Sequence, residues 1–254
     1  MKEQLKIDFE KILKISNFSE KDIKFKKDQL DKFIENGFPG KRLENWKFLD
    51  LNQIINKNIE NISFYNDYST TNKIDTSIYI DGLEHNKIIF INGRIEKIEF
   101  SYEDKNQIEI YDDIKSEDNF SVKNSLINLN NAFSNKYYKI LVKKGYSIKK
   151  PLIIYHLTNE KMKSKNINLR LDFELEENSS LKLIDFFNDI TDKNFMNIFY
   201  NFKLKNDSIL KNYKIDKSLN QNLKYSFRSS GVPHCIKCCS SNIATFRLSL
   251  TIKL

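Results

Sequence analysis

The sequence repeats one short pattern three times, as VKKGYSI at residues 142–148, LEENSSL at residues 175–181 and LKNDSIL at residues 204–210. Each copy begins and ends with an aliphatic residue, and its fourth position holds Gly145, Asn178 or Asp207. These residue types tolerate the left-handed backbone that a tight turn needs. The copies lie about 33 and 29 residues apart, a spacing typical of stacked structural repeats.

The segments around these turns have the alternation of strands. Leu169, Leu171 and Phe173 alternate with polar residues, which predicts one apolar and one wet face. Strand, turn and strand about every 30 residues predict the coils of a β-solenoid. An antiparallel sheet of hairpins is the alternative, because Asn-Ser and Asp-Ser turns are also common there.

The composition favours a globular protein with a solvated surface. Hydrophobic residues make up 40% of the 254 residues, which is enough for a core without disulfides. The net charge of +8 comes from lysines spread along the chain, whereas nucleic-acid-binding proteins usually gather basic residues on one face. The N-terminus has no apolar run of the signal-peptide type and no segment has the length of a membrane span, so we expect a cytoplasmic protein.

The first half of the chain is expected to be partly helical. Residues 2–15 have helical apolar spacing, and a second helix starts near an N-cap pair, Ser19 and Asp22, and stops at Gly37. Residues 56–73 read as a loose loop, and Asn92-Gly93 between two apolar runs predicts a hairpin. A short strand at 108–111 and a helix at 122–133 follow. The predicted divisions are therefore a helical segment at 1–55, a connecting region at 56–135 and the coils at 136–227.

The stretch GFPGKRLENWKFLDL, residues 37–51, resembles the signature near the start of SufD proteins, which take part in iron–sulfur cluster assembly. Phe48 and Leu49 stand where the family usually has Tyr and Thr. Four further places match the family in order: the Asn-Gly hairpin, a Leu-Asn-x-Ala-Phe motif before the coils, a Pro-Leu pair at their start, and Asn197 at a strand entry. The residues that carry the resemblance are Pro39, Arg42, Glu44, Trp46, Lys47, Leu51, Asn92, Gly93, Leu129, Asn130, Ala132, Pro151 and Leu152.

The resemblance implies a mainly β fold: a right-handed parallel β-helix preceded by an N-terminal α-helical segment. It implies a non-catalytic scaffold subunit of the SufBCD complex that pairs with a SufB-like paralogue through the β-helix. A SufC-like ATPase would bind a C-terminal helical domain that this sequence lacks. No cofactor is expected on the chain itself, and the iron–sulfur cluster belongs to the assembled complex. Nucleic acid and membranes are not expected partners.

The composition changes abruptly at residue 228. Residues 228–254 contain no Asp or Glu but hold all three cysteines, so we expect a frameshifted or truncated C-terminus. A metal site is the alternative. Its weak candidates are His234, Cys235, Cys238 and Cys239, because thiolates in a Cys-x-x-Cys spacing can bind one metal ion.

Other functions have weaker signals. A β-helix polysaccharide lyase would need clustered carboxylates, for which Asp172, Glu174 and Asp185 are the candidates, but these read as a solvated strand face. His85 and His156 are expected to be ordinary surface or strand-end residues. A basic nucleic-acid-binding module would need aromatic residues interleaved with Arg on a sheet.

Overall fold

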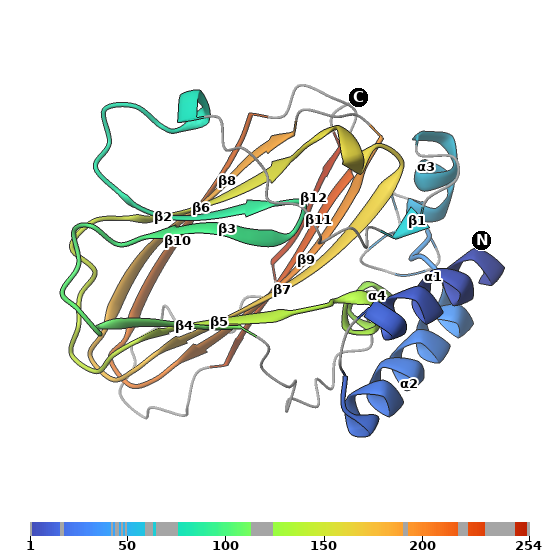
Figure 1. The fold of residues 1–254 in the computed structure, drawn as a ribbon, viewed down its shortest axis with the longest axis horizontal. Coiled ribbons are helices and arrows are strands. Elements are labelled where there is room, and N and C mark those ends of the chain that lie inside the picture. Colours follow the sequence, from blue (N-terminus) through green and yellow to red (C-terminus); the bar gives the residue numbers. More distant parts are fainter. Residues whose placement is uncertain are drawn as a thin grey trace.

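The computed structural model describes residues 2–15, 18–41, 43, 46, 48, 50–58, 63–64, 76–112, 124–189, 193–217, 223–231 and 247–252. It is mainly β, with two sheets face to face and helices gathered at one end of them (Figure 1). The expected mainly β fold behind N-terminal helices is therefore confirmed.

The helices are α1 (Lys2–Ile15), α2 (Glu20–Asn36), α3 (Leu51–Asn58) and α4 (Ser125–Phe133), with short 3₁₀ turns η2 (Thr76–Ile78) and η3 (Glu160–Met162). The strands are β1 (Ser63–Phe64), β2 (Asn86–Ile91), β3 (Arg94–Glu99), β4 (Ile108–Asp112), β5 (Tyr137–Val142), β6 (Leu152–Thr158), β7 (Lys165–Leu175), β8 (Ser180–Asp189), β9 (Phe195–Leu204), β10 (Ile209–Asp216), β11 (Leu223–Gly231) and β12 (Arg247–Ile252).

The N-terminal helices form where the sequence predicted them. On α1, Leu5, Phe9 and Ile12 are buried at helical spacing. The α2 helix begins at a capping box between Ser19 and Asp22, and Gly37, with φ of 68°, donates its N–H to Phe33 at its end. A core of their apolar side chains packs on α4 and on the start of β9.

The two sheets are built by a chain that passes back and forth between them. One sheet has the order β12-β11-β9-β7-β5-β4, with β1 beside β7, and the other has the order β10-β8-β6-β2-β3. From β5 to β11, successive strands alternate between the sheets, and each pairs in parallel with the strand two steps further along. Antiparallel pairs with β3, β4 and β12 make both sheets mixed. A closed β-helix therefore stays a prediction.

The main core lies between the two sheets. Inward side chains such as Ile154, Leu171, Phe173 and Leu183 are fully buried there. A smaller apolar cluster lies on the outer face of the five-stranded sheet, where Tyr79 packs on Tyr155. Alternate residues of the five-stranded sheet therefore pack into two apolar layers, one between the sheets and one on the outer face.

The predicted hairpin joins β2 to β3 at Asn92-Gly93, and both residues have positive φ, 51° and 80°. A Cβ on Gly93 would lie 2.6 Å from Cγ2 of Ile167, so a side chain at this position meets both backbone strain and a clash. Asn92 in turn donates from its amide nitrogen to the side chain of Asn159 at 2.8 Å. The hairpin is therefore fixed to the end of β6 and to β7.

Three predicted boundaries can be compared with the structure. The predicted helix at 122–133 is α4, which begins at Ser125; residues 122 and 123 lie outside the described part. The predicted loop at 56–73 includes the end of α3 and the short strand β1, and its other residues are not among those described. The predicted boundary at 227/228 falls within β11, which continues beside β9 to Gly231.

Candidate functional site

The three repeated turns stack directly on one another. Their first residues, Val142, Leu175 and Leu204, are in register on β5, β7 and β9. Their corner residues, Gly145, Asn178 and Asp207, have φ of 73°, 56° and 55°, which confirms the predicted left-handed position. Backbone bonds join one turn to the next, for example from Gly145 N–H to the carbonyl of Glu177 at 2.8 Å.

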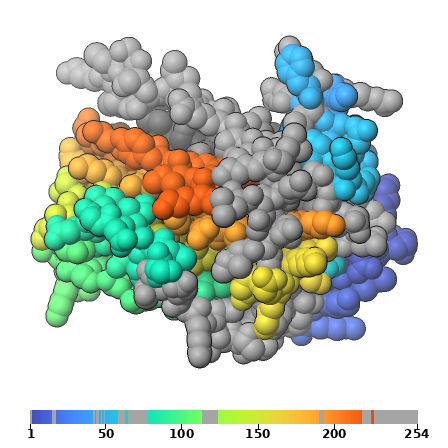
Figure 2. Space-filling model, turned by 90° about the horizontal axis from the view of Figure 1, so that it is seen from above, coloured from blue at the N-terminus to red at the C-terminus, as the bar shows by residue number. Residues whose placement is uncertain are grey.

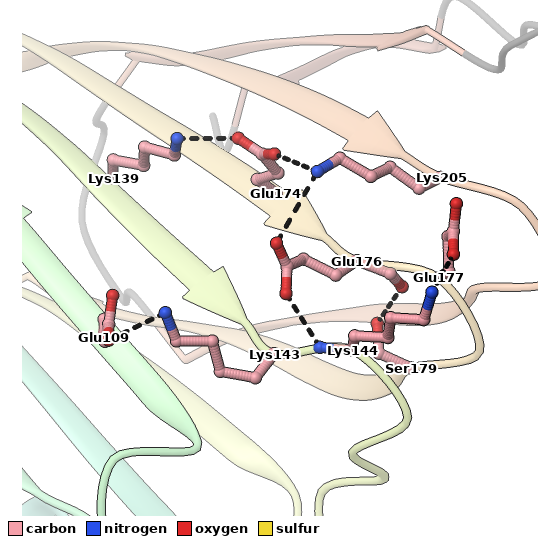
Figure 3. A network of polar contacts seen from close by, with 9 residues as sticks. All are labelled: Glu109, Lys139, Lys143, Lys144, Glu174, Glu176, Glu177, Ser179 and Lys205. Atoms are coloured by element: carbon pink, nitrogen blue, oxygen red, sulfur yellow. Dashed lines mark hydrogen bonds and ion pairs between the residues drawn. The ribbon is translucent and has the colours of Figure 1, made fainter.

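Lysine and glutamate side chains alternate across these turns and form what we call the charge ladder (Figure 3). Glu174 on β7 accepts from Lys139 at 2.6 Å and from Lys205 at 2.9 Å, so it links three neighbouring strands. Burial raises the pKa of Glu174, but the two lysines outweigh that effect and hold the pKa below its usual value. The other ion pairs of the charge ladder are Lys143–Glu109 at 2.8 Å, Lys144–Glu177 at 2.5 Å and Lys205–Glu176 at 3.6 Å.

The first part of the SufD-like motif lies where the helices meet the sheets. Trp46 is buried and stacks on Tyr225 of β11 with ring centroids 5.9 Å apart. The carbonyl of Pro39 accepts the N–H of Leu51, whose side chain is fully buried at the start of α3. Arg42, Glu44 and Lys47 lie outside the described residues.

Asn130 fastens α4 to the seven-stranded sheet. Its buried amide donates to the backbone carbonyls of Leu169 on β7, at 3.0 Å, and Asn197 on β9, at 2.8 Å. Its oxygen accepts from the hydroxyl of Ser134 at 2.9 Å. The side-chain amide of Asn197 donates to the carbonyl of Leu126 on α4 at 2.8 Å. Two motif asparagines therefore join the backbone of α4 to the backbones of β7 and β9 through buried hydrogen bonds.

The other motif residues are also structural. Leu129 and Ala132 are fully buried beside Asn130, Leu152 is fully buried at the start of β6, and the carbonyl of Pro151 accepts the N–H of Asn86. The described motif residues do not converge on one site. They occupy the junctions between the helices, the hairpin and the stacked strands.

A polar cluster of His156, Asp185 and Tyr200 lies in the interior, and it corrects two predictions. His156 is in the middle of β6 and 1% exposed, rather than at a strand end, and Asp185 on β8 is fully buried, rather than on a solvated face. The Tyr200 hydroxyl donates to Asp185 at 2.7 Å and lies 3.0 Å from Nε2 of His156. Burial lowers the pKa of His156, against the opposing effect of Asp185.

This cluster is closed to substrates in the described structure. The His156 ring stacks between Phe90 and Phe187, with centroids 5.7 and 4.6 Å away. A narrow space beside it, lined by apolar residues such as Ile167 and Met196, has no room for a water-sized molecule. The cluster therefore serves to join β6, β8 and β9 across the interior.

His85 is also buried, which corrects its predicted surface position. Its Nδ1 lies 2.5 Å from the carbonyl of Leu83, and its Nε2 lies 2.8 Å from the hydroxyl of Tyr155. That hydroxyl accepts the N–H of Ile80 at 3.2 Å. His85 thus holds the segment before β2 onto the outer face of the five-stranded sheet.

The three carboxylates considered as candidates for a lyase site do not lie together. Asp172 pairs with Arg170 at 3.0 Å, and Glu174 belongs to the charge ladder, both on β7 of the seven-stranded sheet. Asp185 lies in the other sheet and bonds inside the protein. The three side chains are engaged in separate structural contacts.

The tail candidates His234, Cys235, Cys238 and Cys239 lie outside the described residues, so the structure gives no geometry for a metal site there. Within the described ranges, no group of three or more His, Cys, Asp or Glu side chains is arranged to hold a metal ion.

Among the described strands, β10 is a sheet edge with several exposed apolar side chains. This strand is the last of its sheet and pairs only with β8 among the described elements. Its outward side chains include Ile209, Tyr213 and Ile215, which are 56%, 58% and 36% exposed. The face seen in Figure 2 includes this strand, coloured orange.

The opposite edge of the same sheet is different. On β3, Lys97 pairs with Glu99 at 2.8 Å, and Lys87 of β2 reaches Glu99 at 3.3 Å. This edge also exposes Ile98, at 45%, but its charges discourage pairing with other chains, whereas β10 presents three exposed apolar side chains. We therefore take β10 as the candidate interaction site.

Comparison of the chain with protein-family models and with curated proteins finds no match to either. None of the described helices combines the length and the apolar character needed to cross a bilayer.

Proposed function

We propose that this chain is a SufD-like, non-catalytic scaffold subunit that acts in iron–sulfur cluster assembly in the cytoplasm. Its strands from β5 to β11 would be coils of a right-handed parallel β-helix, entered through the N-terminal helices. Support for the coils comes from the alternation of successive strands between two sheets and from the in-register stacking of the repeated turns.

The position of the SufD-like motif carries the proposal. The motif residues that the structure describes lie at the junctions of helices and strands, where all but the half-buried Gly93 and Pro151 are buried, and Asn130 and Trp46 contact elements far away in the sequence. Residues that specify how a helical segment joins a strand stack suit a protein that holds partners in position. A motif that served catalysis would instead be expected to gather reactive groups in an accessible cleft.

A scaffold also needs a surface for its partner. The exposed edge of β10 offers backbone groups to a further strand, and its large apolar side chains add area to such a contact. We assign this edge to a SufB-like paralogue. The cluster would be cargo of the assembled complex rather than a cofactor of this chain.

Co-expression tests this role. The tagged 254-residue chain is produced with a SufB protein and a SufC ATPase and analysed by size-exclusion chromatography with light scattering. We expect a complex that contains SufB, and we expect Tyr213→Glu in β10 to weaken it, with Lys24→Glu on the exposed side of α2 as a control. A well-folded chain, verified by circular dichroism, that stays separate from SufB would refute the proposal.

A further inference from the structure

The edge of β10 presents backbone groups at defined positions. The N–H of Ile209 bonds to the carbonyl of Ser179, just before β8, and the N–H of Lys217 bonds to the carbonyl of Phe187 on β8, each at 2.9 Å. Odd-numbered residues of this strand therefore turn their backbone toward β8. Because this direction alternates along a strand, Leu210 and Asn212 turn their N–H and C=O groups away from β8. These are the groups that an added strand would bond.

Asn212 adds a second observation on the same strand. Both its side-chain oxygen and its side-chain nitrogen are buried, and neither has a hydrogen-bond partner. A buried amide without hydrogen-bond partners destabilises the folded state. A neighbouring strand would place a side chain beside Asn212, and a polar residue there could satisfy both atoms, as Asn168 and Asn197 bond to each other at 2.8 Å between β7 and β9.

The charges on the outer face of the five-stranded sheet indicate which side chains an added strand would carry. Lys211 of β10 and Lys182 of β8 are exposed and directly in register. Like charges in this arrangement repel, and within the described part of the chain neither lysine forms an ion pair. On the other sheet, by contrast, the lysines of the charge ladder are matched by glutamates on neighbouring strands (Figure 3).

We infer that β10 binds an extended acidic segment of a partner protein as an additional strand of the five-stranded sheet. One outward carboxylate of that segment pairs with Lys211 and Lys182, and its outward apolar residues contact Ile209 and Tyr213. An inward polar residue bonds the amide of Asn212. The inference rests on the proposed scaffold role, since it specifies the partner strand that this role requires.

The neighbours of the two lysines favour a protein over a nucleic acid. Tyr213 is the one aromatic side chain on β10, and Ile209 and Ile215 offer no stacking surface for bases, whereas single-stranded nucleic acids are bound chiefly by basic grooves with several aromatic side chains. Backbone groups along a sheet edge, in contrast, are recognised by another strand.

The test uses the full chain and fluorescein-labelled ten-residue peptides. The first peptide alternates Val and Thr and carries one outward Glu and one inward Asn. The second has Lys in place of Glu, and the third is the Glu peptide with alternate backbone nitrogens methylated. By fluorescence anisotropy we expect the first to bind and the other two to bind at least about tenfold more weakly.

A charge-reversal variant completes the design. K182E/K211E should bind the Lys peptide in preference to the Glu peptide, while K21E/K24E, which changes the net charge equally on α2, should behave as the parent chain. Equal binding of the Glu and Lys peptides to the parent chain would overturn the inference, as would binding of a uridine oligonucleotide that abolishes peptide binding.

These experiments test the acidic-strand inference and the SufD-like scaffold role independently. Retention of the SufB complex by K182E/K211E would refute the acidic strand and leave the scaffold role intact. Specific binding of the Glu peptide without any SufB complex would support the acidic strand and refute the SufD-like role.

Discussion

Lys26 on α2 shows how a single buried residue connects the helices. It is 1% exposed, and its Nζ donates to the carbonyls of Asn131, at 3.1 Å, and Ser134, at 2.6 Å, at the end of α4. Burial lowers the pKa of Lys26 to about 7, although Asp22 acts in the opposite direction. A neutral amine has two hydrogens, and the two carbonyls accept both.

The pKa of Lys26 predicts how stability depends on pH. In the unfolded chain a lysine has a pKa of about 10.4, so between pH 7 and about 10 the unfolded state binds more protons than the folded state. The free energy of unfolding should therefore rise with pH in this range, by up to about 1.4 kcal/mol per pH unit.

Urea unfolding of the parent chain and of Lys26→Met at pH 7, 8 and 9 measures this contribution. The difference in free energy of unfolding between the two chains should grow with pH. A difference that stays constant from pH 7 to 9 would show that the ammonium form persists in the folded protein.

At the scale of elements, the docking of α4 depends on Asn130. Replacing Asn130 with Ala removes its two buried bonds, to the carbonyls of Leu169 on β7 and Asn197 on β9. We expect a loss of about 2 to 3 kcal/mol in the free energy of unfolding, measured in urea. Asn128→Ala on the same helix is the matched control and should cost less than about 1 kcal/mol. Equal losses would contradict the role given to the Asn130 amide.

Elements whose signals are local could be predicted from the sequence. Gly145, Asn178 and Asp207 indicated the three turns because each residue favours the left-handed backbone that its own position needs. The capping box at Ser19 and the hairpin at Gly93 are local in the same sense. The spacing of the turns also predicted that they stack.

The burial of polar residues could not be predicted, because their partners come from distant strands. Arg170 looked like part of a wet face, yet it is buried beside Asp172 and between the rings of Tyr137 and Phe199. Asp185 is satisfied by Tyr200 of the other sheet. For the same reason, only the order of strands in the sheet shows that β10 is an edge.

At the scale of the whole molecule, the two ends of the five-stranded sheet are unequal. The β3 end is short and carries charges of both signs, whereas the β10 end has exposed apolar side chains and two lysines in register. The helices pack at the ends of the strands of the other sheet and leave both of these edges uncovered by any described helix (Figure 1). The open side at β10 is thus a property of the strand order and not of one residue.

Amide hydrogen exchange provides the test at this scale. On β8, which lies between β6 and β10, amides of both odd and even residues have strand partners and should exchange slowly. On β10, the N–H groups of Tyr213 and Ile215 point to β8, whereas those of Leu210 and Asn212 point away from it. We expect the two amides that point away from β8 to exchange at least about tenfold faster in two-dimensional NMR spectra of the full chain.

Addition of the Glu peptide should slow the exchange of these two amides and leave the exchange of Tyr213 and Ile215 unchanged. Slow exchange of all four amides before any peptide is added would mean that the edge is already occupied, because only a bonded N–H is protected in this way.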